Sequence, residues 1–589
     1  MIICISLSSR LKALRSSLSN LNLDGFIIQR GDEFLNEYVA PYAERLAWLT
    51  GFTGSAGMAV ILSDCAAVFS DGRYILQMEQ QLNQEEWSSF HISHNPPAKW
   101  IHDQKPNAKI GYDPQLMSEQ DIKPFIDQSI QLVPVERNPI DNLWTDQPDL
   151  PLHPIFPHPI QYSGQSNSEK IALLTQKMKA MDQHAFIFCD PASICWLLNI
   201  RSSDIPYTPI PLVFAILHAN GQVFLYANEK QILPETRGYL GSHVNFHHRE
   251  NLLEDLKHFR NQRIALDPVQ TPLWFLQILE KVNAHIIRQT NPCLLLKSCK
   301  NETEQTGAKK AHLRDGIAMC RFLAWLEKNG IGLSEIEVAQ RLNQFRQETG
   351  GDFYREESFP AISSVGSNAA IIHYQPSSQN NAILQENQIY LIDSGGQYLD
   401  GTTDITRTIW LGKTKAPQEI TDAATCVLKG HIAIDSAIFP EGTNGSRLDS
   451  FARRALWAKG LDFDHGTGHG VGSFLSVHEG PCRISSRAGD VPLQKGMILS
   501  NEPGYYCPNH FGIRLENLLL VKQAKYPKFL SFETLTLVPF DQKIIDPSAL
   551  NDEEKKWLIC YHERIYKEIS PYLNAFEVEW LKQACSSIT

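Results

Sequence analysis

The sequence lacks several features that would place it in a class at once. It has no stretch of about 20 consecutive apolar residues, the length of a membrane-spanning helix. The apolar start is short with no basic residues before it, and the last residues form no hydrophobic tail, so we expect neither a secretory signal nor a lipid anchor. Positive charge is in deficit: 54 Lys and Arg face 65 Asp and Glu, a net charge of −11. That sign disfavours nucleic acid or a membrane surface as the main partner.

Paired cysteines are also missing. The 12 cysteines are scattered, and none form the CxxC spacing of a structural zinc site. A chain of 589 residues has no need of disulfides to hold a core together. Cys189 and Cys195 lie in apolar runs and are predicted to be small buried residues. We therefore expect a cytoplasmic protein with reduced thiols.

The length predicts about two to four domains, and two segments of the N-terminal half resemble each other. Residues 46–52 and 194–200 share a Trp-Leu pattern that predicts a strand, and each is followed by a turn and a hairpin of two apolar strands. Trp48 and Trp196 lie 148 positions apart, a spacing that favours tandem domains.

A proline-rich stretch, residues 139–165, separates the two copies. Proline lacks the backbone donor, so this stretch is predicted to be an extended linker, with His153 and His158 as solvated loop residues. A third region begins near Asn301, which with Glu304 forms an N-cap and its reciprocal acidic partner. The helix that follows is predicted to end at residues 329–330 in a left-handed cap.

Chemistry is concentrated in this third region. Residues 389–411 predict an apolar strand ending at Asp393, a turn, and a second strand on which Asp404 alternates with threonines. The two aspartates lie 11 positions apart on a hairpin, so their carboxylates can converge. Converging carboxylates repel each other unless they are protonated or bridged by cations, and a pair of metal ions removes that conflict.

Three further segments add ligands of the same kind. His469 lies in the glycine-rich segment 465–472, Glu502 ends an apolar strand just before a proline, and Glu516 shares a strand face with Arg514. A lone residue of this kind is more often structural than a ligand, but together they form a set of four carboxylates and one imidazole: Asp393, Asp404, His469, Glu502 and Glu516. This set suits two divalent ions of borderline hardness, and it contains no thiol.

At these residues the sequence resembles the superfamily of methionine aminopeptidase, prolidase and aminopeptidase P, which has the pita-bread catalytic fold. The order Asp, Asp, His, Glu, Glu matches without a gap. Further matching phrases are GSAG at 54–57, DGRY at 71–74, SSVGSNAAIIHYQP at 363–376 and DGTTDITRT at 400–408. The resemblance to the long, three-domain form of aminopeptidase P covers nearly the whole chain.

This resemblance implies an α+β and α/β multidomain protein. Two tandem creatinase-type α/β domains would occupy residues 1–150 and 151–300. A pita-bread metallopeptidase domain would occupy residues 301–589, with a helical extension from about 530 that assists contact in a homodimer. Helical patterns at 551–568 and 576–585 fit such an extension.

The resemblance also divides the ligands. Asp393 and Asp404 would hold one metal, with Asp404 bridging; His469 and Glu502 would hold the other, with Glu516 bridging. Manganese is the usual ion of the family, although the side chains would equally admit cobalt, zinc or iron. A bridging water would be lowered toward hydroxide and attack the scissile carbonyl.

The family pattern assigns roles to further residues. Glu502 would pass a proton to the leaving proline nitrogen, and His478 would stabilise the oxyanion. His373 would contact substrate, and His465 matches a pocket histidine for which a structural role is an equal alternative. Arg514 would orient a carboxylate. Tyr505 is a candidate for the proline pocket.

One segment departs from the family pattern. Residues 506–510 replace the acidic or glycine-rich run that often precedes the final Gly-Ile-Arg. Inert packing is the better interpretation of Cys507 than ligation of a thiophilic metal.

The predicted function is release of the N-terminal residue from peptides with proline at the second position. One alternative is a prolidase that cleaves only X-Pro dipeptides, because the ligand motifs do not separate the two. Another is a pita-bread protein without catalysis that binds peptides or histones. Such proteins usually lose a metal ligand, whereas all five positions are filled here.

Overall fold

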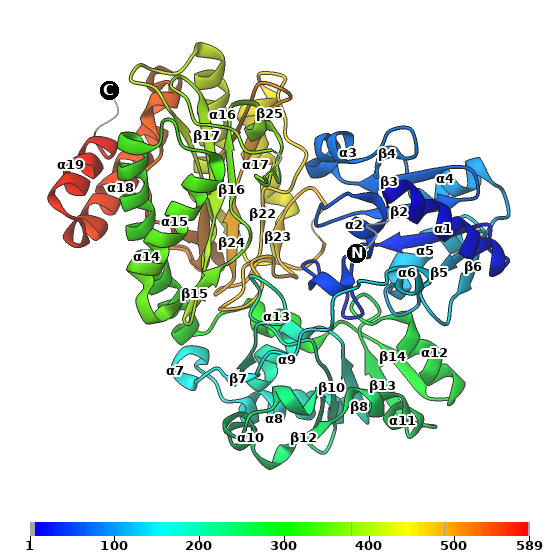
Figure 1. Ribbon diagram of the computed structural model, residues 1–589. Helices are drawn as coiled ribbons and strands as arrows, with labels where there is room; N and C mark the ends of the chain where they lie inside the picture. Colours follow the sequence, from blue (N-terminus) through cyan, green and yellow to red (C-terminus); the bar gives the residue numbers. More distant parts are fainter. Residues whose placement is uncertain (1–5, 379, 488, 587–589) are drawn as a thin grey trace. The chain divides into compact units, whose positions relative to one another are not determined.

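A computed structural model describes residues 6–378, 380–487 and 489–586, so the expectations about the two chain ends fall partly outside the described residues. The chain divides into two compact units (Figure 1). The first unit contains Met1–Ile160 and Gln165–Cys293, and the second contains Gln161–Gly164 and Leu294–Thr589. Within the described residues, no helix is long and apolar enough to cross a bilayer. The division into domains at 150 and 300 stays a prediction.

In its described residues, the first unit builds two six-stranded sheets with the same plan. The strand orders are β4-β3-β2-β1-β5-β6 and β12-β11-β10-β8-β13-β14. In each sheet an antiparallel hairpin pairs with one parallel strand on its outer side, and two more parallel strands continue beyond the first strand. The predicted duplication is therefore present in the fold. The strands are β1 (Gly25–Gln29), β2 (Met58–Leu62), β3 (Ala66–Ser70), β4 (Ser88–His91), β5 (Lys109–Tyr112), β6 (Gln131–Pro134), β8 (Ala185–Phe188), β10 (Phe214–His218), β11 (Val223–Tyr226), β12 (Val244–His247), β13 (Arg263–Leu266) and β14 (His285–Arg288).

Helices cover these sheets: α1 (Leu7–Asn20), α2 (Arg45–Thr50), α3 (Ile75–Gln81), α4 (Pro97–Gln104), α5 (Glu119–Asp127), α6 (Pro139–Leu143), α8 (Asn167–Ala180), α9 (Pro191–Leu198), α10 (Pro234–Leu240), α11 (Leu252–Lys257) and α12 (Leu273–Lys281). The two Trp-Leu segments are helices, α2 and α9, so their prediction as strands was wrong. Both helices end in a left-handed residue, Gly51 at φ 81° and Asn199 at φ 52°. A short apolar run has no period that separates a buried strand from a buried helix, so the sequence pattern does not distinguish the two.

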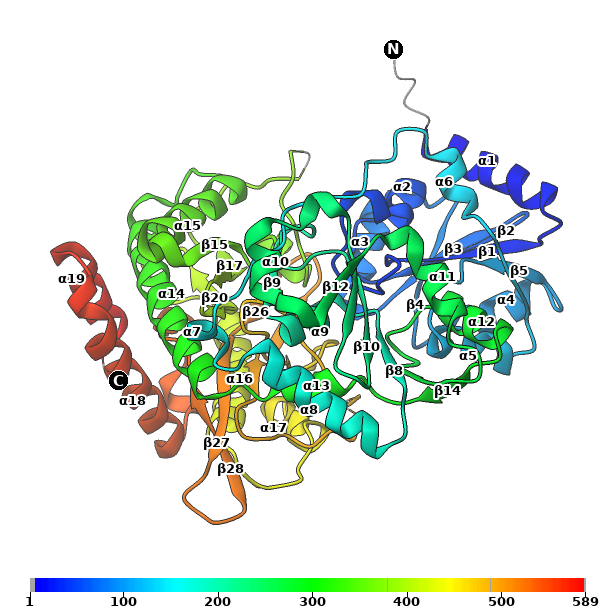
Figure 2. The same cartoon turned by 90° about the horizontal axis from the view of Figure 1, so that it is seen from below.

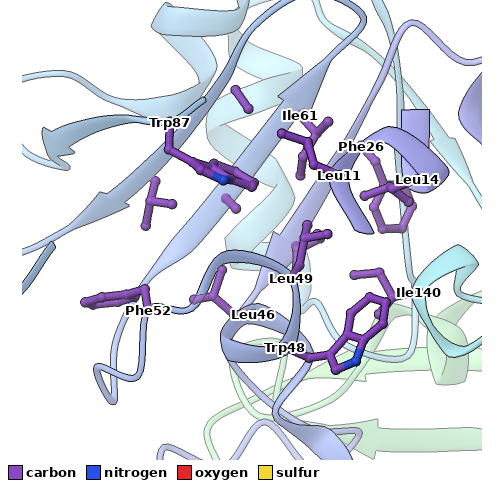
Figure 3. Close-up of a cluster of buried hydrophobic side chains, with 14 of the residues drawn as sticks. Leu11, Leu14, Phe26, Leu46, Trp48, Leu49, Phe52, Ile61, Trp87 and Ile140 are labelled. Atoms are coloured by element: carbon purple, nitrogen blue, oxygen red, sulfur yellow. The ribbon is translucent and has the colours of Figure 1, made fainter. Parts of the chain in front are cut away.

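The core of the first sheet has two sides. Phe26 and Ile61 face the side covered by α1, where they pack with Leu11, Leu14 and Trp48 (Figure 3). Their neighbours Ile27 and Val60 face a second cluster on the opposite side. Successive side chains of a strand point to opposite faces, so strands buried on both faces are apolar throughout.

The proline-rich stretch is only partly an extended linker. It contains α6, the short strand β7 (Phe156–Pro157) and α7 (Ile160–Ser163), and β7 pairs with β9 (Ile200–Arg201). His158 is only 2% exposed, so its prediction as a solvated residue was wrong. Its backbone N–H donates to the Asn199 carbonyl at 2.8 Å, and burial lowers the pKa of its imidazole. The side chain of His153 is 55% exposed, as expected.

The second unit is organised around a long helix, α14 (Glu302–Asn329), which packs against α15 (Glu335–Gly350) and the two C-terminal helices (Figure 1). Asn301 and Glu304 form the predicted capping box. Gly330 has φ −71°, so the predicted left-handed cap at this end is wrong, and the left-handed turn occurs at Gly332 with φ 90°. The other helices are α13 (Pro292–Ser298), α16 (Gln418–Asp435), α17 (Ser446–Trp457), α18 (Asp552–Ile569) and α19 (Ala575–Ala584), the last two as predicted from the sequence.

Short antiparallel sheets fill the rest of the described second unit, and the hairpin of β27 and β28 stands out in Figure 2. The sheet orders are β15-β18-β19, β16-β17-β20, β21-β28-β27-β24, β22-β23 and β25-β26. Their strands are β15 (Tyr354–Glu357), β16 (Ile362–Val365), β17 (Ile389–Ser394), β18 (Gly396–Tyr398), β19 (Gly401–Thr402), β20 (Ile405–Trp410), β21 (Ile438–Pro440), β22 (Gly468–His469), β23 (Arg483–Ile484), β24 (Ile498–Asn501), β25 (Gly504–Cys507), β26 (Phe511–Arg514), β27 (Asn517–Gln523) and β28 (Phe529–Thr534).

A buried arginine joins β20 to the C-terminal part of this unit. Arg407 is 1% exposed, and its guanidinium lies 4.2 Å from the centre of the Phe540 ring. It donates to four backbone carbonyls and two side chains, those of Thr406, Glu516, Val538, Pro539, Asn517 and Tyr561. Carbonyls that turn inward need such a donor, because a buried acceptor without one costs free energy.

We predict that Arg407→Met lowers the free energy of unfolding of the second unit by about 3 kcal/mol or more, because it leaves several buried acceptors without a donor. Calorimetry and urea unfolding measure the change. Arg355→Met, at an exposed position of β15, is the matched control and should change stability by no more than about 0.5 kcal/mol. Equal stability of the two variants would contradict this account of Arg407.

Candidate metal centre

The strands that flank the two aspartates pair as expected: β17 and β20 are antiparallel, and Asp393 lies opposite Thr406. They do not form a simple hairpin, because β18 and β19 lie between them in the chain and belong to another sheet. Asp393 is the residue before the end of β17, and Asp404 immediately precedes β20. Both residues are buried, at 7% and 4% exposure.

The other predicted ligands come from separate strands. His469 ends β22, Glu502 follows β24, and Glu516 lies between β26 and β27. The His469 Nε2 atom lies 3.5 Å from a carboxylate oxygen of Asp404 and 3.5 Å from one of Glu502. One ligand atom each of Asp404, His469 and Glu516 lie within 4.8 Å of one another.

Glycines allow this approach. A Cβ atom on Gly468 would lie 1.9 Å from the Ser500 carbonyl oxygen, and one on Gly470 would lie 2.1 Å from the Glu479 carbonyl oxygen. Neither distance is possible for a real side chain, so glycine at 468 allows β22 to lie against β24, and glycine at 470 allows the chain to lie against Glu479. This agrees with the sequence-based inference that the glycines around His469 allow close backbone approach.

Burial and mutual repulsion shift the pKa values of the carboxyl groups in the cluster. Burial, together with the neighbouring carboxylates, raises the pKa of Asp393 and Glu516, and burial raises the pKa of Glu502. Burial alone would lower the pKa of His469, but hydrogen bonding to Asp404 and the charges of Glu502 and Asp404 outweigh it and raise that pKa to about 9. The cluster therefore retains protons where no other positive charge is present.

Two buried oxygens give a direct test of whether metal ions fit. Asp393 Oδ1 and Glu516 Oε1 have no hydrogen-bond partner among the described residues. Buried carboxylate oxygens are normally paired, and oxygen atoms beside an imidazole nitrogen are the donors that divalent ions such as Mn²⁺ accept. The donor set therefore fits the dinuclear centre that the sequence predicts.

Neighbouring groups orient the ligands. The Arg514 guanidinium donates to Asp393 Oδ2 at 2.7 Å, and the Thr406 hydroxyl donates to Glu516 Oε2 at 2.8 Å. His469 Nδ1 lies 2.9 Å from the Gly470 carbonyl oxygen, which makes Nδ1 the donor and leaves Nε2 to face the carboxylates. The predicted pairing of Arg514 with a carboxylate is present.

The three additional histidines occupy different positions. The His478 ring lies 4.3 Å from the His469 ring, edge to face. His465 Nε2 lies 2.8 Å from the Tyr506 hydroxyl. His373 lies in a turn after β16, and the carbonyl of the preceding Ile372 accepts from Arg514 at 3.3 Å.

Sequence reasoning missed Tyr506. Its hydroxyl accepts from Arg514 at 2.8 Å, so it links His465 to the arginine that orients Asp393. Burial raises the pKa of this phenol to about 12. The sequence-based candidate for the proline pocket was Tyr505, whereas neighbouring residues of β25 point to opposite faces. The alternation of the strand was the signal that could have drawn attention to Tyr506.

A buried group of charges beside His478 was missed as well. Glu479 pairs with Lys300 at 2.6 Å and Lys297 at 3.1 Å, and all three side chains are at most 4% exposed. The spacing of these residues in the sequence offers no signal for this contact. Cys507, in β25, is not part of the metal-ligand cluster identified among the described residues.

Comparison with known families covers both units. The sequence model for metallopeptidase family M24 matches residues 306–523, and that for the C-terminal region of the same peptidases matches residues 528–588. Two models of the creatinase/prolidase N-terminal domain match residues 10–137 and 146–304.

Similar proteins extend over the full length. A protein of Laccaria bicolor named "Probable Xaa-Pro aminopeptidase P" is 39% identical over 99% of this chain and 94% of its own length. The crystal structure of the X-prolyl aminopeptidase of Caenorhabditis elegans, described as a cytosolic enzyme with a di-nuclear active site, is 34% identical over 99% of this chain and all of its own, with a TM-score of 0.94. The prolidase of Pyrococcus horikoshii is 23% identical over 63% of this chain and 99% of its own, with a TM-score of 0.51, and shares the fold.

Stripping a metal from this centre should make stability depend on pH. Groups whose folded pKa is raised bind more protons folded than unfolded, so the stability they contribute is lost as pH rises. The metal-free protein should therefore lose stability from the ordinary glutamate pKa of 4.5 upward, through the value of about 9 for His469. Thermal unfolding of chelated protein over this range measures the effect.

Protein reloaded with Mn²⁺ is the control and should gain relative stability as pH rises, because protons compete with the metal. A metal-free midpoint that rises over the same range would refute this electrostatic account.

Proposed function

The chain belongs to the Xaa-Pro aminopeptidase P family, within metallopeptidase family M24, and on that basis we propose that it releases the N-terminal residue from peptides whose second residue is proline. Its fold combines creatinase-type N-terminal domains with an M24 pita-bread domain. The main support for this proposal is the full-length similarity to aminopeptidases of this specificity, together with the cluster of Asp404, His469 and Glu516.

The family and the donor set support two bound metal ions, and we propose Mn²⁺. Asp393 and Asp404 would hold one ion, and His469 and Glu502 the other, with Asp404 and Glu516 shared. When bound, the ions supply Lewis-acid activation of water and of the scissile carbonyl. The chain's own groups then have to bind the substrate, hold it in place and move protons.

Proton transfer falls to Glu502. Burial raises the pKa of its carboxyl group, and a buried carboxyl group of this kind can act as a general acid and base. An amide nitrogen leaves only after it has been protonated, so the departing proline nitrogen must receive a proton. Glu502 lies beside His469 in the cluster, close to where that proton is needed.

The other three histidines are assigned to substrate binding and to stabilising the reacting groups. His478, packed against His469, donates toward the oxygen on which negative charge develops. His373 contacts the substrate from its turn. His465 acts through Tyr506. The hydrogen bonds that run from His465 through Tyr506 and Arg514 to Asp393 hold the cluster in a fixed geometry.

The prolidase alternative is weaker. The similarity to prolidases is in fold, at 23% identity over 63% of this chain. Non-catalytic relatives usually lose a metal ligand, whereas carboxylates and an imidazole occupy all five positions here.

We also propose that the protein is a cytoplasmic homodimer acting on peptides. The C. elegans enzyme is described as cytosolic, and the family resemblance implies dimer contact through the C-terminal extension. Size-exclusion chromatography with light scattering should give twice the 66.6 kDa mass of one chain. A mass of one chain at micromolar concentration would refute the dimer.

Substrate choice is tested with metal-stripped protein reloaded with Mn²⁺. We expect release of arginine from a peptide beginning Arg-Pro-Pro, measured by mass spectrometry, and little cleavage of the dipeptide Gly-Pro. Cleavage of the dipeptide alone would move the assignment to prolidase. Metal binding without cleavage of either would support the binding protein.

Asp404→Ala should remove both bound metal and activity, because Asp404 supplies a ligand atom to the cluster that it forms with His469 and Glu516. Metal content by elemental analysis and kcat/KM on the same peptide check this, with a loss of about 1,000-fold or more expected. Asp352→Ala, an exposed aspartate of the same unit, is the control and should keep both. An active Asp404→Ala protein would refute the assigned centre.

A further inference from the structure

The turn that carries His373 belongs to a loop, residues 366–382, of which residue 379 lies outside the described residues. The loop leads from β16 through the short helix η7 (Gly366–Ala370) toward β17. His373 lies in neither a strand nor a helix, so the hydrogen bonds of a sheet do not position it. One backbone hydrogen bond closes the turn, from the Tyr374 N–H to the Ile371 carbonyl at 3.0 Å, and side-chain contacts attach the loop to the rest of the unit.

One buried carboxylate contacts both ends of the loop. Glu335, the first residue of α15, is 0% exposed. Its Oε1 accepts from the Val365 backbone N–H at 2.8 Å and from the Asn368 amide at 3.0 Å. Its Oε2 accepts from the Tyr374 hydroxyl at 2.8 Å and from the Ala382 backbone N–H at 2.8 Å.

The backbone of Glu335 is held as well. Its N–H donates to the Ala382 carbonyl at 3.0 Å, and its carbonyl accepts from the Ser363 hydroxyl at 2.7 Å. Four neutral donors around one buried carboxylate offset much of the cost of removing it from water, and hydrogen bonds to a charged acceptor are short and strong. Glu335 is thus a rigid point to which the loop is attached.

The residue before His373 is anchored from another direction. The Ile372 carbonyl accepts from Arg514, and the same guanidinium nitrogen donates to Asp393 at 2.7 Å. His373 therefore lies between Ile372, which is tied to the metal centre, and Tyr374, which is tied to Glu335. The two anchors therefore hold the turn from both sides of His373.

We propose that Glu335 is a positioning residue for the peptidase reaction, holding the loop so that His373 meets the substrate at the metal centre. This inference rests on the proposed function and deepens it. Glutamine at this position would offer one oxygen and two hydrogens where Glu335 offers two oxygens. Its amide hydrogens would face donors, so part of the network would be left unpaired and the turn would shift.

The test uses full-length protein loaded with Mn²⁺ and the Arg-Pro-Pro peptide. For Glu335→Gln we expect kcat/KM to fall by about 10- to 100-fold, as expected for misplacement on the scale of 1 Å, with metal content unchanged. Glu337→Gln is the matched control on the same helix. Glu337 accepts from the Ser334 N–H and hydroxyl as the helix cap, outside the loop, and its loss should change kcat/KM by no more than about twofold.

A double-mutant cycle separates positioning from general weakening. If Glu335 acts through His373, then Glu335→Gln should cause no further loss in a His373→Ala background. Tyr374→Phe, which removes one of the four donors without changing the buried charge, should show the same coupling with a smaller loss. It carries the cycle if Glu335→Gln does not fold.

Losses that multiply fully in the cycle would overturn the inference, as would wild-type kcat/KM in both Glu335→Gln and Tyr374→Phe. The two proposals fail differently. A wild-type protein without metal-dependent release of arginine would overturn the proposed function and this inference together. An active wild type with uncoupled variants would overturn the inference alone.

Discussion

The carboxylates of Asp393, Asp404 and Glu516 are buried near one another in the second unit, and they repel each other unless protons or cations are present. Glu502 joins them through its contact with His469. Such a cluster opposes folding, so the surrounding chain has to supply the stability that the cluster lowers. A pair of divalent ions removes the repulsion and supplies the activation of water that peptide hydrolysis requires. The requirement to keep these oxygens together explains most of the architecture around them.

Two buried arginines meet that requirement in different ways. Arg514 donates hydrogen bonds to Asp393, Tyr506 and the Ile372 carbonyl, so it connects a predicted ligand to the turn that carries His373. Arg407, on the strand that follows Asp404, binds backbone carbonyls of the ligand region and of the segment before the C-terminal helices. The C-terminal extension therefore contacts the segment that carries a predicted ligand, because Tyr561 of α18 also contacts Asn517, next to Glu516.

Order in the loops of this unit depends on buried polar groups rather than on sheets. Glu335 organises the loop that carries His373, and Glu479, paired with two lysines, lies next to His478. Both carboxylates are buried. Glu479 directly follows His478 in the sequence, and Glu335 contacts the loop that carries His373. Buried charges are tolerated only when their partners are fixed, so these loops have little freedom to rearrange.

The sequence by itself determined the family, through phrases that match along nearly the whole chain. It also predicted five metal ligands, their order and the metal chemistry they suit. Those predictions rest on local patterns: a carboxylate at the end of an apolar strand, glycines around a histidine, and a proline that ends a ladder. The capping box at Asn301, the antiparallel strands that flank Asp393 and Asp404, and the helices after residue 551 were predictable for the same reason. Only the tertiary structure decided that the segments holding Trp48 and Trp196 are helices, that His158 is buried, and that Tyr506, Glu335 and Glu479 contact the residues around the site. Those contacts join residues from 8 to 179 positions apart. A pairing between buried side chains leaves no periodic trace in the chain, because it depends on which surfaces meet after folding.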